Sequence, residues 1–130
     1  RPLDRLSELG GEADRLRALS PSGMPRFLAS IHGNVEANEQ TAQIVVESDA
    51  IPRLRSGYDR FDAASNADGL ELRAVTDELP YAVVLFDEAE IGLFGYEEGI
   101  LVGATFSDDP DALSWGECVF GQTFERSEKI

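Results

Sequence analysis

The spacing of hydrophobic positions changes from segment to segment along the chain, and it predicts where helices and strands lie. Apolar residues recur every three or four positions in four segments, which indicates amphipathic helices. They alternate or run together in six shorter segments, which indicates strands. The predicted helices span residues 1–11, 22–38, 49–65 and 109–130, and the predicted strands span 13–20, 41–48, 69–76, 81–86, 90–96 and 100–106.

Capping and turn residues support the predicted helix starts. Ser22 precedes one helix and Asp109 another, and both residue types accept hydrogen bonds from the first backbone N–H groups of a helix. Pro25 should lie in the first helical turn, where its missing N–H costs nothing. Gly116 and Gly121 each weaken the last helix by about 1 kcal/mol relative to alanine, so we expect both to pack closely against the sheet.

The order of these elements predicts the fold class. The strands at 81–86, 90–96 and 100–106 are separated by short acidic turns, which is typical of an antiparallel meander. The two earlier strand–helix units should pair in parallel, because Ile44 to Val46 are too continuously apolar for a half-exposed strand. We therefore predict one α/β domain over residues 1–130. Its mixed sheet would hold about six strands, from two β-α units, a strand and the meander, with helices packed on it.

The charge balance narrows the range of partners. The chain has 25 acidic and 11 basic residues, for a net charge of −14. Such a surface repels the phosphate backbone of nucleic acids, so these residues should not bind DNA by themselves. Two interpretations remain open. Dense carboxylates can keep a protein solvated at high salt, or an acidic face can bind a basic partner.

Reactive side chains are scarce. Cys118 is the only cysteine and His32 the only histidine, which excludes an internal disulfide and a zinc site built from these residue types alone. Asp108, Asp109 and Asp111 could be drawn as a metal cluster, but the start of a helix explains them more simply. We predict no catalytic residue, no metal site and no cofactor. No apolar run is long enough to span a membrane and no signal peptide is visible, so we expect a cytoplasmic protein.

The best candidate site follows from topology. In open α/β sheets, ligands bind beyond the carboxyl ends of the parallel strands. Arg26 and Arg53 both lie in the first turn of a helix at that edge, where helix N–H groups and guanidinium groups could bind a small anionic metabolite together. Alternatively, the two arginines simply pair with neighbouring carboxylates. The predicted ligand-binding residues are Ser20, Arg26, Asp49, Arg53, Thr76 and Tyr81.

The second half of the chain resembles a known family. Residues 79–120 are similar to the closing half of the effector domain of archaeal winged-helix transcriptional regulators. This family is named after the middle domain of a methanogenesis regulator and is abundant in haloarchaea. The first half fits more loosely. The residues that match the family pattern are Leu79, Pro80, Tyr81, Asp87, Tyr96, Gly99, Asp109, Pro110, Ala112, Trp115 and Glu117.

The resemblance implies a fragment of a longer regulator from a halophilic source. An N-terminal winged-helix domain, absent from this chain, would bind DNA, and the DNA-binding unit would be a homodimer. The resemblance also implies a distant likeness to half of a phospholipase D fold. That enzyme pattern needs His and Lys two residues apart, whereas His32 is followed by Gly33 and Asn34. The chemistry is therefore expected to be absent, and we expect no enzyme activity.

Three functions stay open at this point. The first is a ligand-sensing and/or dimerisation domain of a transcriptional regulator, which we favour. The second is a scaffolding or dimerisation module without a ligand. The third is a small metal-dependent hydrolase that uses clustered carboxylates.

Overall fold

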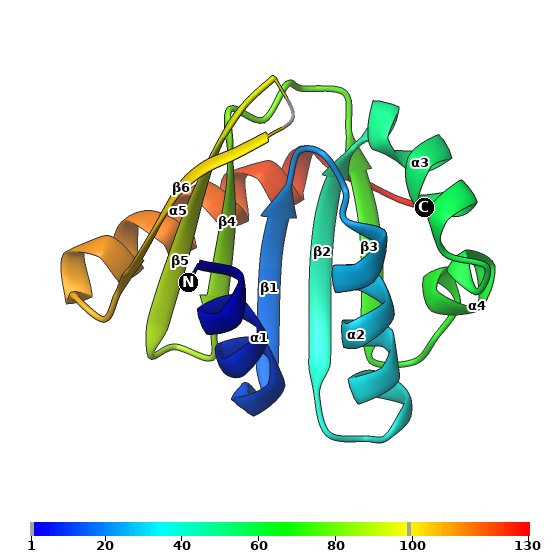
Figure 1. Cartoon of the computed structure of the whole chain (residues 1–130), viewed down its shortest axis with the longest axis horizontal. Coiled ribbons are helices and arrows are strands. Elements are labelled where there is room, and N and C mark those ends of the chain that lie inside the picture. Colours follow the sequence, from blue (N-terminus) through cyan, green and yellow to red (C-terminus); the bar gives the residue numbers. More distant parts are fainter. Residues whose placement is uncertain (1, 99) are drawn as a thin grey trace.

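A mixed β-sheet with helices on both faces organises the chain (Figure 1). The computed structural model describes residues 2–98 and 100–130, and the side chains from residue 4 onward within these ranges. The strands are β1 (Arg15–Ser20), β2 (Thr41–Glu47), β3 (Leu70–Val75), β4 (Tyr81–Phe86), β5 (Glu90–Glu97), β6 (Ile100–Ser107) and β7 (Glu128–Lys129). The helices are α1 (Pro2–Glu12), α2 (Pro25–Glu36), α3 (Ile51–Gly57), α4 (Phe61–Ser65) and α5 (Pro110–Arg126), with a 3-10 turn η1 at Ser48–Ala50.

The strand pairing confirms the predicted fold class. The sheet has the order β6-β5-β4-β1-β2-β3-β7; β1, β2 and β3 pair in parallel, and β4, β5 and β6 form the antiparallel meander. Strand β4 joins the two halves because it pairs antiparallel with β1. The described sheet has seven strands, and β7 is the one that the sequence did not predict. Its two residues, which directly follow Ser127 at the end of the last helix, pair with Arg73 and Ala74 of β3.

Both faces of the sheet are covered, and each face has its own hydrophobic core. Helices α1 and α2 lie on one face and α5 crosses the other (Figure 1). Alternation along the strands separates the two cores: Ile44 and Val46 point into the first, and Val45, which has no exposed surface, points into the second. The prediction that Ile44 to Val46 are covered on both faces is therefore confirmed.

Helix α5 largely follows the prediction. The Asp109 carboxylate accepts a hydrogen bond from the backbone N–H of Asp111 at 2.8 Å, as expected of an N-cap. Phe120 is buried against the sheet. A side chain at Gly116 would collide with Ile91, which confirms close packing there. The same expectation is wrong for Gly121, because a Cβ at that position would meet nothing within 4 Å.

Two predicted boundaries are wrong near the first connections of the sheet. Ser22 does not cap α2: the N-cap residue is Met24, without a side-chain cap. Gly23 has a φ of 60°, so the chain is still turning there and the helix begins later. Residues 49–65 do not form one helix either, because Tyr58 has an extended backbone between α3 and α4. That break lets the Tyr58 hydroxyl reach buried His32 Nδ1 at 2.6 Å.

The turn between β4 and β5 is tied to the start of β1. Asp87 has a φ of 56°, and its Oδ1 accepts hydrogen bonds from the backbone N–H groups of Asp14 at 3.0 Å and Arg15 at 2.8 Å. This side chain thus holds the first strand and the meander in register at one end of the sheet. No helix in the described ranges is both long and apolar enough to cross a membrane.

Candidate functional site

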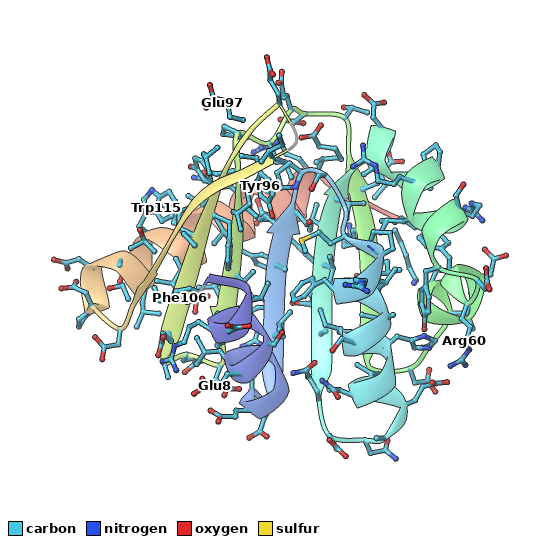
Figure 2. All side chains as sticks on the ribbon, in the orientation of Figure 1. Glu8, Arg60, Tyr96, Glu97, Phe106 and Trp115 are labelled. Atoms are coloured by element: carbon cyan, nitrogen blue, oxygen red, sulfur yellow. The ribbon has the colours of Figure 1, made fainter. Side chains whose placement is uncertain are left out.

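A cavity of about 320 Å³ lies at the carboxyl ends of β1 and β2, at the edge where topology predicts a ligand site. Loops from separate strands surround it: the β1–α2 loop, the β2–α3 connection through η1, and the β3–β4 loop. Tyr96 from β5 adds a wall, and Figure 2 shows its side chain near the carboxyl end of β1. The lining residues are Pro21, Ser22, Glu47, Asp49, Ala50, Arg53, Glu78, Leu79, Pro80 and Tyr96.

Hydrogen bonds hold the loops around this cavity in place. Glu47 accepts a hydrogen bond from the backbone N–H of Leu79 at 2.9 Å, which ties the end of β2 to the β3–β4 loop. Ser48 donates to the carbonyl of Val75 at 3.0 Å. The guanidinium of Arg53 donates to the carbonyl of Ser22, which ties α3 to the β1–α2 loop. Hydrogen bonds thus connect the loops at the rim of the cavity to one another.

The charges that line the cavity are mixed. Glu47, Asp49 and Glu78 contribute carboxylates, and Arg53 is the cation among the described lining residues. Arg53 donates to a carbonyl and forms no ion pair among the described side chains, so it keeps N–H groups available. The arrangement could therefore bind a small polar molecule that carries both an anionic and a cationic group.

Tyr96 closes the cavity as a neutral wall. Its ring is half-buried, and burial raises the pKa of its hydroxyl above the ordinary value of 10.0. The hydroxyl therefore stays protonated at neutral pH, and it donates to the sulfur of Met24 at 3.6 Å. Tyr96 can stack or donate a hydrogen bond to a ligand, but it is not poised to act as a base.

The structure brings two of the six predicted site residues to this cavity. Asp49 and Arg53 line it. Ser20 is buried beneath it, where its side chain borders two small apolar cavities of about 10 and 20 Å³. Arg26 and Thr76 are exposed outside the lining, and among the described residues Arg26 makes no hydrogen bond or ion pair.

Tyr81 lies on the other face of the sheet. It packs against Trp115 of α5, with ring centroids 5.7 Å apart, and belongs to the core under that helix. Alternation along β4 turns this residue away from the cavity, although it follows Pro80 directly.

Sequence reasoning missed the other eight lining residues, and Glu47, Glu78 and Tyr96 bring the largest polar side chains among them. Glu47 and Glu78 flank the predicted loops, so their position at strand ends was a usable signal. Nothing in the sequence associates Tyr96 with these loops, because it enters through the pairing of β5 beside β4.

A larger groove, of about 550 Å³, lies at the opposite edge of the parallel strands. It is lined by Arg15, Gln43, Glu71 and Lys129 among others, on the part of the sheet face that α5 leaves open (Figure 1). Polar side chains on an uncovered sheet face need no ligand to explain them. We therefore take the smaller cavity as the candidate site, because its lining comes from loops that follow several strands.

Side chains suited to metal or nucleophilic chemistry do not gather at the candidate site. Over residues 2–98 and 100–130, no group of three or more His, Cys, Asp and Glu side chains is arranged to hold a metal ion. His32 is a buried residue of α2 that is hydrogen-bonded to Tyr58 and is not part of the cavity lining, and Cys118 is exposed on α5. Among the described lining residues, the polar side chains are three carboxylates, one guanidinium, one phenol and the hydroxyl of Ser22.

Comparison with known families gives one match. The family described as the middle domain of the methanogenesis regulatory protein FilR1 matches residues 1–126. The residues that carried the resemblance lie within this range; of these, Gly99 is outside the described residues. No curated protein matches the chain.

Several solved structures resemble the fold, among them the following three. TrmBL2, an archaeal chromatin protein described as having a novel mode of DNA binding, has a TM-score of 0.77 at 18% identity; the match covers 99% of this chain but 50% of TrmBL2. NucT from Helicobacter pylori has a TM-score of 0.76 at 11% identity, over 99% of this chain and 91% of NucT. Nuc from Salmonella typhimurium, a phospholipase D family member, has a TM-score of 0.65 at 9% identity, over 98% and 90%.

These identities establish a shared fold and nothing finer. The distant likeness to a phospholipase D fold that the sequence predicted is confirmed. The chain spans about half the length of TrmBL2.

Proposed function

The chain belongs to the family of the middle domain of the methanogenesis regulatory protein FilR1, and on this basis we propose that it is the regulatory domain of an archaeal transcription regulator. The proposed domain is not an enzyme and works in the cytoplasm. DNA would be bound by a separate winged-helix domain, because the net charge of −14 opposes contact between this domain and phosphates. The homodimer expected from the family resemblance is part of this proposal, and so is adaptation to high salt.

We further propose that the cavity at the carboxyl ends of β1 and β2 binds a small metabolite. The observation that carries this proposal is Arg53, a cation without a carboxylate partner among the described residues, at the wall of an open cavity that loops after three strands line. Arg53 would contact an anionic group of the ligand, as the sequence predicted. Glu47, Asp49 and Glu78 favour a ligand that also carries a cationic group, for example an amino acid-like metabolite.

Sensing would work through a population shift. The cavity is built from loops that follow three different strands, so a ligand that contacts all three would favour the arrangement in which they are closest. The equilibrium between the two loop arrangements would shift by the difference in their free energies of ligand binding. That shift would change how the attached DNA-binding domains are placed.

Thermal unfolding with a panel of anionic and zwitterionic metabolites tests the ligand site. A compound present at 100 times its dissociation constant should stabilise the domain by about 2.7 kcal/mol. Arg53→Ala should abolish that stabilisation. Arg55→Ala is the matched control, because Arg55 lies on the same helix and pairs with Asp62 at 2.8 Å outside the cavity. Stabilisation that survives Arg53→Ala would place the ligand elsewhere, and the absence of any stabilising compound would favour the ligand-free scaffold.

The hydrolase alternative rests on the carboxylates of the chain, of which Glu47, Asp49 and Glu78 line the cavity. Titration with divalent metals in the presence of generic phosphoester substrates tests it directly. Turnover that depends on the metal and is lost on Asp49→Asn would replace the regulatory proposal with an enzymatic one.

A further inference from the structure

Exposed apolar side chains are concentrated at one corner of the molecule. Among the described residues, the large hydrophobic side chains that stand exposed are Ile100 at 68%, Val102 at 61% and Trp115 at 41%. Ile100 and Val102 belong to β6, the strand at one edge of the sheet, and Trp115 lies in the first half of α5. Figure 2 shows Trp115 at the β6 side of the molecule, on the opposite side from Arg60 near α4.

Contacts across the meander place Trp115 and Val102 on one side of the sheet, and Ile100 precedes Val102 by two residues on the same strand. Trp115 packs on Tyr81, Tyr81 pairs with Gly95 of β5, and a Cβ at Gly95 would lie 3.9 Å from Val102. The register between β5 and β6 shifts at Gly95 and Tyr96, so β6 has an extra residue there. This bulge leaves Val102 on the same side of the sheet as Tyr81. We call these four residues, Tyr81, Ile100, Val102 and Trp115, the β6 patch.

The two edges of the sheet differ in protection. The β7 edge is two residues long and consists of Glu128 and Lys129, whose charges discourage pairing with another strand. The β6 edge is eight residues long, and residues 100–107 carry no charge. A long, uncharged and apolar edge beside an exposed tryptophan is typical of a surface that contacts another protein chain.

The distribution of charge on the chain indicates which partner fits the β6 patch. The β6 patch carries no carboxylate, so a basic partner would gain no ion pair within it. Outside this patch, the surface of a second copy is rich in carboxylates. Packing those carboxylates on Ile100 and Val102 would remove water from them at a cost in free energy. The same patch on a second copy is uncharged and apolar, and a two-fold axis brings the two patches together.

We propose that the β6 patch is the surface through which two copies of this domain associate. This interface rests on the homodimer proposed above, and it specifies where that dimer forms. Glu97 and Glu98 precede the strand and Asp108 and Asp109 follow it, so an antiparallel pair brings the acidic start of one strand near the acidic end of the other. Added salt screens this repulsion, so association should tighten as salt rises.

Trp115 provides a local reporter, because it is the only tryptophan of the chain. We would measure mass by analytical ultracentrifugation and Trp115 emission over the same protein concentrations, at low and high salt. We expect the mass to double while the emission shifts to shorter wavelength and acrylamide quenching falls. Val102→Lys and Val102→Asp should each weaken association by more than about tenfold, because each places a charge in an apolar contact. One charge is positive and the other negative, so a loss in both variants does not depend on the sign of the charge.

Ala63→Lys and Ala63→Asp are the matched controls, since Ala63 is exposed on α4 far from the patch and receives the same charges. Val102→Thr, which keeps the branched shape, shows whether the site tolerates substitution and should associate more strongly than either charged variant. Circular dichroism confirms that each variant is folded.

The possible results distinguish failure of the proposed surface from failure of the proposed homodimer. A dimer that persists in both charged Val102 variants, or forms without a change at Trp115, overturns the proposed surface and leaves the homodimer standing. A chain that stays monomeric at all concentrations and salts overturns both. Association that weakens as salt rises indicates an ionic contact and also overturns the proposed surface.

Discussion

Arg17 of β1 and Glu117 of α5 form a two-pronged ion pair between the sheet and the helix that crosses it. The side chain of Arg17 is 6% exposed; one guanidinium nitrogen contacts Glu117 Oε1 and the other lies 2.7 Å from Oε2. The second nitrogen also donates to the carbonyl of Asp87 at 3.2 Å. Glu117 is one of the residues that matched the family pattern, and the pair gives it a structural role: it neutralises a cation buried in the middle of a strand.

Removing the carboxylate should therefore destabilise the domain. We expect Glu117→Gln to lower the free energy of unfolding by about 2 kcal/mol, less than for a fully buried pair because water reaches Glu117. Urea unfolding measures this. Arg126→Ala, which breaks an exposed pair with Asp77, should cost less than about 1 kcal/mol. Replacing both partners at once, as Arg17→Met with Glu117→Leu, should recover much of the loss. Equal urea midpoints for Glu117→Gln and the unchanged chain would contradict this account.

The same pair should make stability depend on pH. The hydrogen bond from Arg17 lowers the pKa of Glu117 below its ordinary value of 4.5, although burial acts in the opposite direction. The carboxylate form is therefore favoured by folding. Its contribution is fully present above pH 4.5 and is lost as the pH falls through the lower pKa of the folded state. The difference in melting temperature between the unchanged chain and Glu117→Gln should stay constant above that pH and shrink below it. A difference that grows on acidification would have the wrong sign.

Two glycines of α5 should respond oppositely to alanine. At Gly116 a Cβ would collide with Ile91 and lie 3.1 Å from Leu85, so Gly116→Ala should cost about 1–3 kcal/mol through overpacking. At Gly121 nothing lies within 4 Å of the new Cβ, so Gly121→Ala should stabilise the helix by up to about 1 kcal/mol. Thermal unfolding of the two variants decides the matter. If both shift the melting temperature in the same direction, the proposed depth of α5 on the sheet is wrong.

The hydrogen bond between His32 and Tyr58 should contribute to the stability of the domain, although it lies away from the candidate site. Tyr58→Phe would leave the Nδ1 atom of a buried imidazole without its partner, at an expected cost of about 1–2 kcal/mol. The matched control is Tyr81→Phe, because the hydroxyl of Tyr81 makes no hydrogen bond within the described ranges. Removing that hydroxyl should change the free energy of unfolding by about 0.5 kcal/mol or less. Chemical denaturation of both variants compares them. Similar costs would mean that the His32 contact adds little.

Local patterns along the chain determined most of the architecture. The strands of the meander, the parallel units and the cap at Asp109 could be predicted because periodicity, short acidic turns and capping chemistry act over a few residues. The same reasoning failed for residues 49–65. Their helical spacing persists across the break at Tyr58, and only the packing of that residue on His32 shows why the helix stops.

For the candidate site, the sequence by itself determined the edge of the sheet and two of its residues, Asp49 and Arg53, because a parallel strand order implies where loops meet. Only the tertiary structure decided that Tyr96 closes the cavity, that Tyr81 turns away from it, and that Ile100, Val102 and Trp115 share a surface. The physical reason is the same in each case. The register of β4 against β5, the bulge in β6 and the path of α5 depend on contacts between residues distant in the sequence, which leave no local pattern.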